Sequence, residues 1–179
     1  MVNLNEDPFL DRKVIYDIKS DEPLVCGRRN KNSDHKLQLG GAGIEPDHCN
    51  FVTMPDGSVM VVPISDKAMA NVRVNGVVIP ILGITLKPND RICIGPSAIF
   101  LFKNKQKEDE ASMPDTEDDP ITFDFAAEEV ENNDGKAEKE AQHKLQKEMA
   151  EANAKKLAEM EAKMEIEKKK HKEEMERRI

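Results

Sequence analysis

The chain has 179 residues, of which 35% are charged, and its formal net charge is -8. This surplus of acid argues against nucleic acid or an anionic membrane surface as a partner, because both are negatively charged themselves. No apolar run approaches the roughly 20 residues that a membrane-spanning helix needs. The opening residues MVNLNEDPFL do not form a signal peptide, so we expect a soluble, cytoplasmic chain.

Charge is distributed unevenly and divides the chain into three segments. Residues 1–103 carry 12 basic and 12 acidic side chains, residues 104–135 carry 2 and 12, and residues 136–179 carry 13 and 11. Only the first segment has the apolar density of a folded core, and its length suits one domain. We therefore predict a globular domain at 1–103, an acidic linker at 104–135 and a charged helix at 136–179.

The first segment has the spacing of β-strands. Between residues 14 and 102 the apolar residues come in short runs, separated by turn signals such as Pro-Asp-Gly at 55–57 and Asn-Gly at 75–76. Several short strands at such intervals predict a sandwich or a barrel and exclude a helical bundle. Three cysteines lie inside these runs, so we expect buried thiols without disulfides at Cys26, Cys49 and Cys93.

The acidic segment changes character near its end. Residues 104–119 are polar and contain Pro114, which predicts a flexible linker. Residues 120–130 interrupt this polarity with Ile121, Phe123 and Phe125, before the helix-favouring sequence AAEEV. We predict that residues 120–130 dock against another surface. The alternative is a helix start preceded by an incidental apolar patch.

Residues 136–179 contain neither Pro nor Gly, and Ala, Glu, Lys, Met and Leu dominate, which predicts one long helix. Acidic and basic side chains recur four positions apart and stabilise a helix without any partner. A broken apolar stripe, here called the helix seam, comprises Leu145, Met149, Leu157, Met160 and Met164. Its spacing is longer than the coiled-coil repeat of about 3.5 residues. We expect a marginal parallel homodimer, and a lone charge-stabilised helix is the alternative.

Chemistry-bearing motifs are missing from the sequence. The glycines at 40–43 lack the lysine and the following helix of a phosphate loop, and the cysteines and histidines lack the spacing of a zinc site. No nucleophile, base and orienting acid form a recognisable set. We therefore expect no catalytic residues, no cofactor and no metal.

An ordered series of motifs crosses the predicted β domain. Gly27-Arg28 follows one strand, His48 precedes another, and Asn75-Gly76 forms a turn. In this order the series resembles the forkhead-associated (FHA) domain over about residues 5–103. The resemblance implies an 11-stranded β-sandwich whose loops read phosphothreonine peptides.

A phosphate group needs a cation and several hydrogen-bond donors, and Arg28 would supply the cation. Elsewhere the sequence departs from the family pattern, since Glu45 stands at the phosphate-binding serine and Met69 and Ala70 stand at a Thr-Asn pair. The positions of this degenerate pocket are Arg28, Glu45, His48, Asn75 and Gly76. The alternative is a structural role, in which His48 satisfies loop backbone and Asn75-Gly76 forms a tight hairpin turn.

With these departures, the sequence resembles the FHA domains of kinesin-3 microtubule motors. Residues 2–8 read VNLNEDP, Glu45 replaces the serine, and Cys49 follows His48. In that family a polar linker, a Pro-Val-Asp-Trp-x-Phe-Ala segment and a charged coiled coil follow. Here residues 120–126 read PITFDFA, with Phe123 in the tryptophan position.

This resemblance implies a non-motor region of an ATP-driven microtubule motor on the microtubule cytoskeleton, without the ATPase domain. In the family such a region supports dimerisation and autoinhibition through neighbouring coils and receives cargo adaptors. We therefore expect protein partners, a homodimer through helical segments and intramolecular contact with other coils. The alternative function is a phosphothreonine-peptide reader that uses the degenerate pocket.

Overall fold

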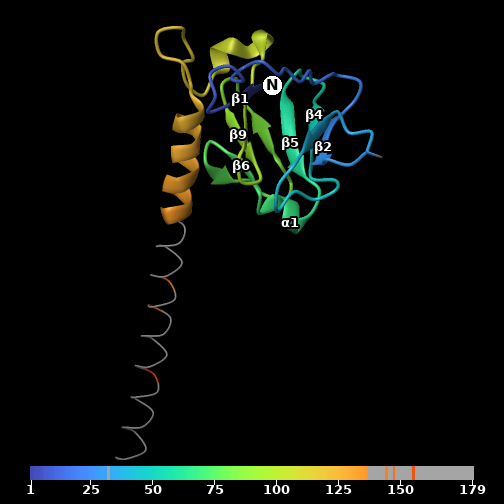
Figure 1. Cartoon of the computed structure of the whole chain (residues 1–179), viewed down its shortest axis with the longest axis vertical. Helices are drawn as coiled ribbons and strands as arrows, with labels where there is room; N and C mark the ends of the chain where they lie inside the picture. Colours follow the sequence, from blue (N-terminus) through green and yellow to red (C-terminus); the bar gives the residue numbers. More distant parts are fainter. Residues whose placement is uncertain (32, 137–143, 145–146, 148–154, 156–179) are drawn as a thin grey trace, which may run out of the picture. The chain divides into compact units, whose positions relative to one another are not determined.

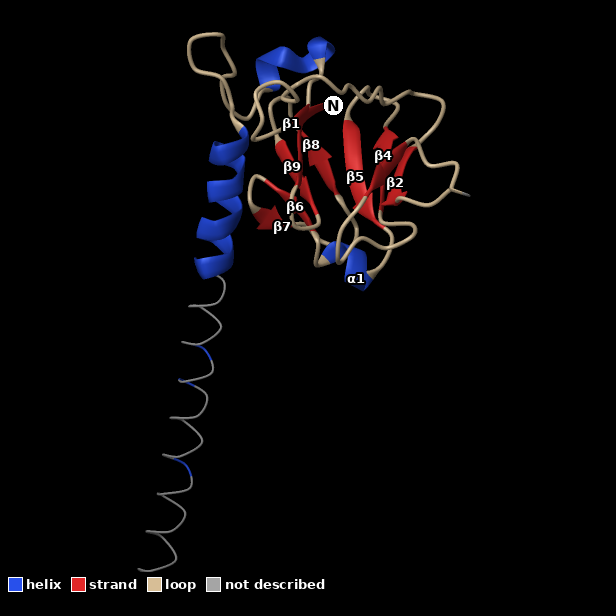
Figure 2. Cartoon of the chain, in the orientation of Figure 1, coloured by secondary structure: helices blue, strands red, loops and turns tan. Residues whose placement is uncertain are grey.

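The computed structural model describes residues 1–31, 33–136, 144, 147 and 155. Within these residues the chain is mainly β and forms two five-stranded sheets (Figures 1 and 2). The first sheet has the order β1 (Val2–Leu4), β10 (Ala98–Leu101), β9 (Arg91–Ile94), β6 (Val72–Val74) and β7 (Val77–Val78). The second has the order β3 (Leu37–Leu39), β2 (Leu24–Arg28), β4 (Cys49–Thr53), β5 (Val59–Pro63) and β8 (Ile84–Leu86). The predicted two-sheet β architecture is confirmed.

Ten strands are found in the described residues, where the FHA resemblance implied 11. An isolated antiparallel bridge joins Val2 to Ile15, at the edge where a further strand would pair with β1. Tyr16 N extends this contact by donating to Met1 O at 2.8 Å. Just before the bridge, Arg12 has a φ of 55°, which takes the backbone out of the extended conformation. The eleventh strand is thereby reduced to a single bridge.

The main core lies between the two sheets. Phe51 and Val61 from the second sheet are fully buried against Ile92 and Ile94 from the first. Cys26 and Cys49 are cross-strand neighbours on β2 and β4, and all three cysteines are buried and free, as predicted. The hydrogen bond from Cys26 and burial raise the pKa of the Cys49 thiol.

The first sheet is covered on its outer face as well. All four residues of β9 are buried, although alternation sends only Ile92 and Ile94 toward the main core. A second apolar cluster accounts for the other face. This outer-face cluster consists of Leu4, Cys93, Ile99, Leu101, Ile121 and Ala126.

Residues after the last strand provide that cover. The compact unit runs from Met1 to Asp134 and includes a 3-10 helix, η1 (Lys105–Glu110), and helical residues from 123 onward. The sequence predicted that the domain ends at 103 and that residues 104–119 form a flexible linker. The compact unit reaches Asp134 instead, because Ile121 and Ala126, 3% and 2% exposed, fill the outer face of the sheet.

The second unit comprises Gly135–Ile179, and the five positions described in it are helical. Every residue of the helix seam lies outside the described residues, so the seam stays a prediction: Leu145, Met149, Leu157, Met160 and Met164. Over the described part of the chain, no helix is both long and apolar enough to cross a membrane.

Candidate functional site

Three of the predicted pocket residues converge where β2 ends and β4 begins. Arg28 is the last residue of β2, and its backbone N donates to Glu45 O at 2.9 Å. Its side-chain Nε donates to Ile44 O at 2.7 Å. Glu45 N in turn donates to His48 Nδ1 at 3.1 Å. Arg28, Glu45 and His48 therefore hold one loop together through their own contacts.

Gly27 explains why a glycine precedes the arginine. A Cβ at this position would lie 1.9 Å from Pro46 O and 2.5 Å from His35 Cδ2. Real Cβ atoms do not approach backbone so closely, so only glycine lets the loop at 44–46 pack against β2. The Gly-Arg pair thus has a structural reason that requires no ligand.

His48 is fully buried between loops. Its Nδ1 accepts from Glu45, and within the described residues its Nε2 has no partner at good hydrogen-bond geometry. Burial lowers the pKa of His48, while the Asn71 backbone and the Glu45 charge oppose the shift. A neutral imidazole that accepts a backbone N–H fits the structural role, not that of a cation for phosphate.

Arg28 also lines an open cleft of about 430 Å³, together with Asn30, Ser33, Asp34, His35, Pro46 and Asp47. The Arg28 side chain is exposed, and only its Nε is engaged in the described residues. His35 Nε2 lies 2.6 Å from Asp47 Oδ1. Two carboxylates line the cleft and Glu45 adjoins it, so a phosphate dianion would meet one arginine and several like charges.

Asn75 and Gly76 belong to the first sheet, in the turn between β6 and β7. Their φ angles are 52° and 77°, which suits an Asn-Gly hairpin turn. Asn75 Oδ1 accepts from Arg91 N at 3.0 Å, and its Nδ2 donates to Asp90 Oδ1 at 2.9 Å. A Cβ at Gly76 would lie 2.4 Å from Glu129 O. This turn therefore supports the segment on the outer face.

That segment, residues 111–134, is here called the docked segment, and its helical part, residues 123–134, the docked helix. Arg91, only 7% exposed, donates from Nε to Glu129 Oε2 at 2.8 Å and from Nη2 to Glu129 Oε1 at 2.5 Å. Its guanidinium carbon lies 5.5 Å from the centre of the Phe125 ring. Its Nη1 donates to Asn89 O at 3.0 Å and to Ser112 Oγ at 3.3 Å. One buried guanidinium thus joins β9 to three parts of the chain.

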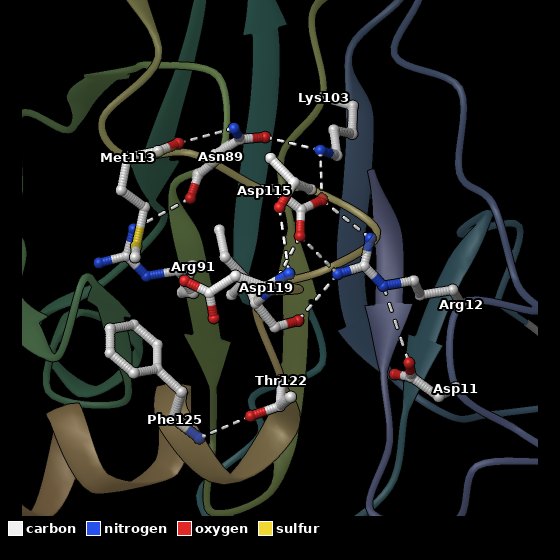
Figure 3. Close-up of polar contacts among 12 residues, drawn as sticks. Asp11, Arg12, Asn89, Arg91, Lys103, Met113, Asp115, Asp119, Thr122 and Phe125 are labelled. Atoms are coloured by element: carbon white, nitrogen blue, oxygen red, sulfur yellow. Dashed lines mark hydrogen bonds and ion pairs between the residues drawn. The ribbon is translucent and has the colours of Figure 1, made fainter.

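A second polar anchor surrounds Asp115 (Figure 3). Arg12 donates to both carboxylate oxygens, at 2.8 and 2.9 Å, and Lys103 Nζ donates at 2.6 Å. Ile121 N also donates to Asp115 Oδ1, at 2.8 Å. The Asp115 side chain is 4% exposed, and its hydrogen bonds to Arg12 hold its pKa far below the usual value. This carboxylate fixes the N-terminal turn and the docked segment to each other.

The predicted docking residues lie along this surface. Ile121 is buried in the outer-face cluster, Phe123 packs against it half-buried, and Phe125 is 39% exposed beneath Arg91. At the end of the docked helix, Arg73 and Asp134 form an ion pair at 3.1 Å. The surface that receives these residues is the chain's own first sheet.

Sequence reasoning missed the residues that anchor the docked segment, namely Arg12, Arg91, Asp115 and Glu129. One signal was present: Arg91 opens the otherwise apolar run RICI, and a charge buried in a strand needs an acidic partner. No group of three or more potential ligand residues that could hold a metal occurs among the described residues. The contacts described at this site are all made within the chain itself.

Comparison with known proteins gives matches to kinesin-like proteins. Human KIF14 is 36% identical over 159 residues, which cover 83% of this chain and 9% of KIF14. Human KIF1C is 30% identical over 75% of the chain and 12% of its own length, and rat KIF1A is 29% identical over 75% and 8%. The chain thus spans about a tenth of the length of these relatives. No protein-family model matches it.

Among solved structures, FHA domains are similar to part of this chain. The FHA domain of the CT664 protein from Chlamydia trachomatis has a TM-score of 0.41 and 22% identity, over 49% of this chain and 80% of that one. The MEK1 FHA domain in complex with a HOP1 phosphothreonine peptide has a TM-score of 0.40 and 22% identity, over 49% and 85%.

Proposed function

We propose that this chain, whose sequence matches the FHA region of kinesin-3 family members over most of its length, is a non-motor regulatory region that works through protein–protein interaction. One observation carries the proposal: the docked segment closes the outer face of the first sheet through the outer-face cluster and the Arg91–Glu129 pair. A β-sandwich that grips the start of a helix can transmit its own state to whatever that helix binds.

Three kinds of contact hold the docked helix on the first sheet, and together they define its position there. Apolar side chains exclude water from the sheet, Arg91 fixes Glu129 by two charge-assisted bonds, and Gly76 allows the helix backbone to approach the β6–β7 turn. A shift of the helix along its axis would break all three. The position of the docked helix on the first sheet is therefore fixed by these contacts.

The finer roles extend this proposal. Residues 136–179 would assemble a homodimer through the helix seam, and the sandwich would contact other coils in an autoinhibited state or receive cargo adaptors. The parent protein would be an ATP-driven motor on the microtubule cytoskeleton of the cytoplasm. Motor activity would belong to other parts of that protein, because the chain spans 9% of the length of human KIF14.

Sedimentation of the chain across micromolar concentrations tests the assembly role. We expect a concentration-dependent dimer that weakens when Met160 and Met164 are both replaced by Ala. Glu159→Ala with Lys169→Ala, away from the seam on the predicted helix and without change in net charge, is the matched control and should leave the dimer intact. A monomer at every concentration, or equal weakening in both variants, would remove assembly from the proposal.

A second candidate function is phosphothreonine reading, which the exposed Arg28 beside its cleft favours. Calorimetric titration with phosphothreonine peptides should then give binding that unphosphorylated peptides lack. Arg28→Ala should abolish this binding, while Arg29→Ala, a neighbouring exposed arginine outside the cleft, should preserve it. Absence of phosphate-dependent binding, or its survival in Arg28→Ala, rejects the reader.

A further inference from the structure

Ser112 lies at the solvent edge of the Arg91–Glu129 pair. Its Oγ accepts from Arg91 Nη1 at 3.3 Å, and its backbone N donates to Pro88 O at 2.8 Å. Ser112 itself is exposed, whereas Arg91 is buried. The hydroxyl of this exposed residue therefore touches the guanidinium that holds the docked helix, and it donates to Pro88 O at 3.4 Å.

The sequence around Ser112 is strongly acidic. It is preceded closely by three exposed carboxylates, Glu108, Asp109 and Glu110, whereas the side chain of Asp115, three positions later, is buried and paired with Arg12 and Lys103. A kinase with a basic substrate groove is complementary to such a segment. The serine thus combines accessibility, an acidic context and contact with a structural arginine.

We propose that Ser112 is a phosphorylation site and that its phosphorylation releases the docked helix from the first sheet. In the reaction the Ser112 hydroxyl oxygen forms a bond to the γ-phosphorus of ATP. The bond from that phosphorus to the β,γ-bridging oxygen breaks, ADP leaves, and the hydroxyl proton passes to the kinase's general base.

The release follows from competition for Arg91. A phosphoserine carries about -1.5 to -2 charges and three strong acceptor oxygens. The Arg91 guanidinium already donates four hydrogen bonds through Nε, Nη1 and Nη2, and two of them go to Glu129. The phosphate accepts hydrogen bonds from the Arg91 guanidinium in place of Glu129, and its negative charge repels the Glu129 carboxylate. Glu129 is 21% exposed and can turn into water, whereas Arg91 is fixed in β9.

Loss of this pair leaves the helix attached by its apolar contacts and by the Arg73–Asp134 ion pair at its end. Phe125, which is 39% exposed, then also loses the cation above its ring. Because two charge-assisted bonds are lost, the open state of the docked helix gains roughly tenfold or more in population. The first sheet and the main core keep their own hydrogen bonds and stay folded.

The first test asks whether the site can be modified. The whole chain is incubated with casein kinase II and ATP, and phosphorylated residues are mapped by mass spectrometry. We expect phosphate on Ser112. Absence of phosphate at this residue after prolonged incubation would overturn its assignment as a modification site.

The second test asks whether modification releases the helix. The whole chain is made with phosphoserine at position 112, and hydrogen exchange is compared with that of the unmodified chain. Amides of residues 123–134 should exchange roughly tenfold faster or more, while those of β4 keep their protection. Phosphoserine at position 97, an exposed serine of the β9–β10 turn, is the matched control and should change neither region. Unchanged or slower exchange at 123–134 would overturn the release.

A third arm identifies the mechanism. In Glu129→Gln the carboxylate that the phosphate displaces is absent, so phosphoserine at 112 should accelerate exchange by much less than in the wild-type background. The same acceleration in both backgrounds would show that Arg91 and Glu129 are not the target and would overturn the proposed competition.

Discussion

Arg91 and Glu129 lie 38 positions apart in the sequence and form two charge-assisted hydrogen bonds, at 2.8 and 2.5 Å. Arg91 comes from the first strand position of β9, and Glu129 comes from the docked helix. The same guanidinium reaches the loop before the helix through Ser112. The position of the helix on the sheet therefore depends on one buried cation.

Glu129→Ala should lower the free energy of unfolding by about 1–3 kcal/mol, because it leaves Arg91 buried without its carboxylate. Denaturant unfolding at neutral pH measures this loss. Glu128→Ala removes an exposed carboxylate from the same helix and should change stability by less than about 0.5 kcal/mol. Equal effects of the two variants would contradict the role given to Arg91.

Gly76→Ala should destabilise the compact unit by about 1–3 kcal/mol. Its φ is 77°, and the new Cβ would lie 2.4 Å from Glu129 O and 2.6 Å from Asn133 Nδ2, so the docked helix must move away. Gly40→Ala meets no atom within 4 Å and is the matched control for thermal unfolding. A Gly76→Ala chain with the stability of wild type would mean that the helix does not rest on this turn.

Asp115 should make the free energy of unfolding depend on pH in the acidic range. Its pKa in the folded chain is held below the unfolded value, mainly by Arg12, so its contribution is complete above about pH 5 and declines as pH falls below about 4. Asp115→Asn should lose about 2 kcal/mol at pH 7 and show a flatter pH profile below pH 5. Asp118→Asn, an exposed neighbour, should keep the wild-type profile in urea unfolding between pH 7 and 3. A wild-type profile in Asp115→Asn would exclude this carboxylate as the acid-sensitive group.

His48 acts in a higher pH window. Burial lowers its pKa in the folded chain, so the unfolded chain binds the proton first and stability falls as pH drops below about 6.5. His48→Asn keeps an acceptor for Glu45 N but does not titrate, so its stability should vary less than that of wild type between pH 7 and 5. Parallel plots of stability against pH for the two chains across that window would show that folding does not change the pKa of His48.

Much of the sandwich could be predicted from the sequence. The runs that become β4 and β5 are short, rich in β-formers and separated by a Pro-Asp-Gly turn, so local preference and tertiary structure agree. Asn75-Gly76 likewise specifies its own turn. The apolar run that begins at residue 14 forms one bridge, at Ile15, because the backbone at Arg12 turns through a conformation that composition does not reveal.

The docked segment was harder to predict, because its stability comes from pairs distant in sequence. Ile121 and Phe123 predicted an apolar contact. The surface that they contact is the outer face of β9 and β10. The sequences of these strands, RICI and IFLF, indicate burial but do not show which segment covers them. The acidic composition of residues 104–135 predicted a linker. Asp115 and Glu129 instead meet Arg12 and Arg91, and a count of charges does not show such pairing.

The pairing of β1 with β10 sets the order in which this chain can fold on the ribosome. Val2 is paired with Leu101, so the first strand to be synthesised waits for nearly the whole sandwich before it finds its neighbour. Even then the sheet presents Leu4, Cys93, Ile99 and Leu101 to water until Ile121 and Ala126 have left the exit tunnel. During that interval the nascent chain presents an apolar face to chaperones, which closes only when residues 104–126 have emerged from the tunnel.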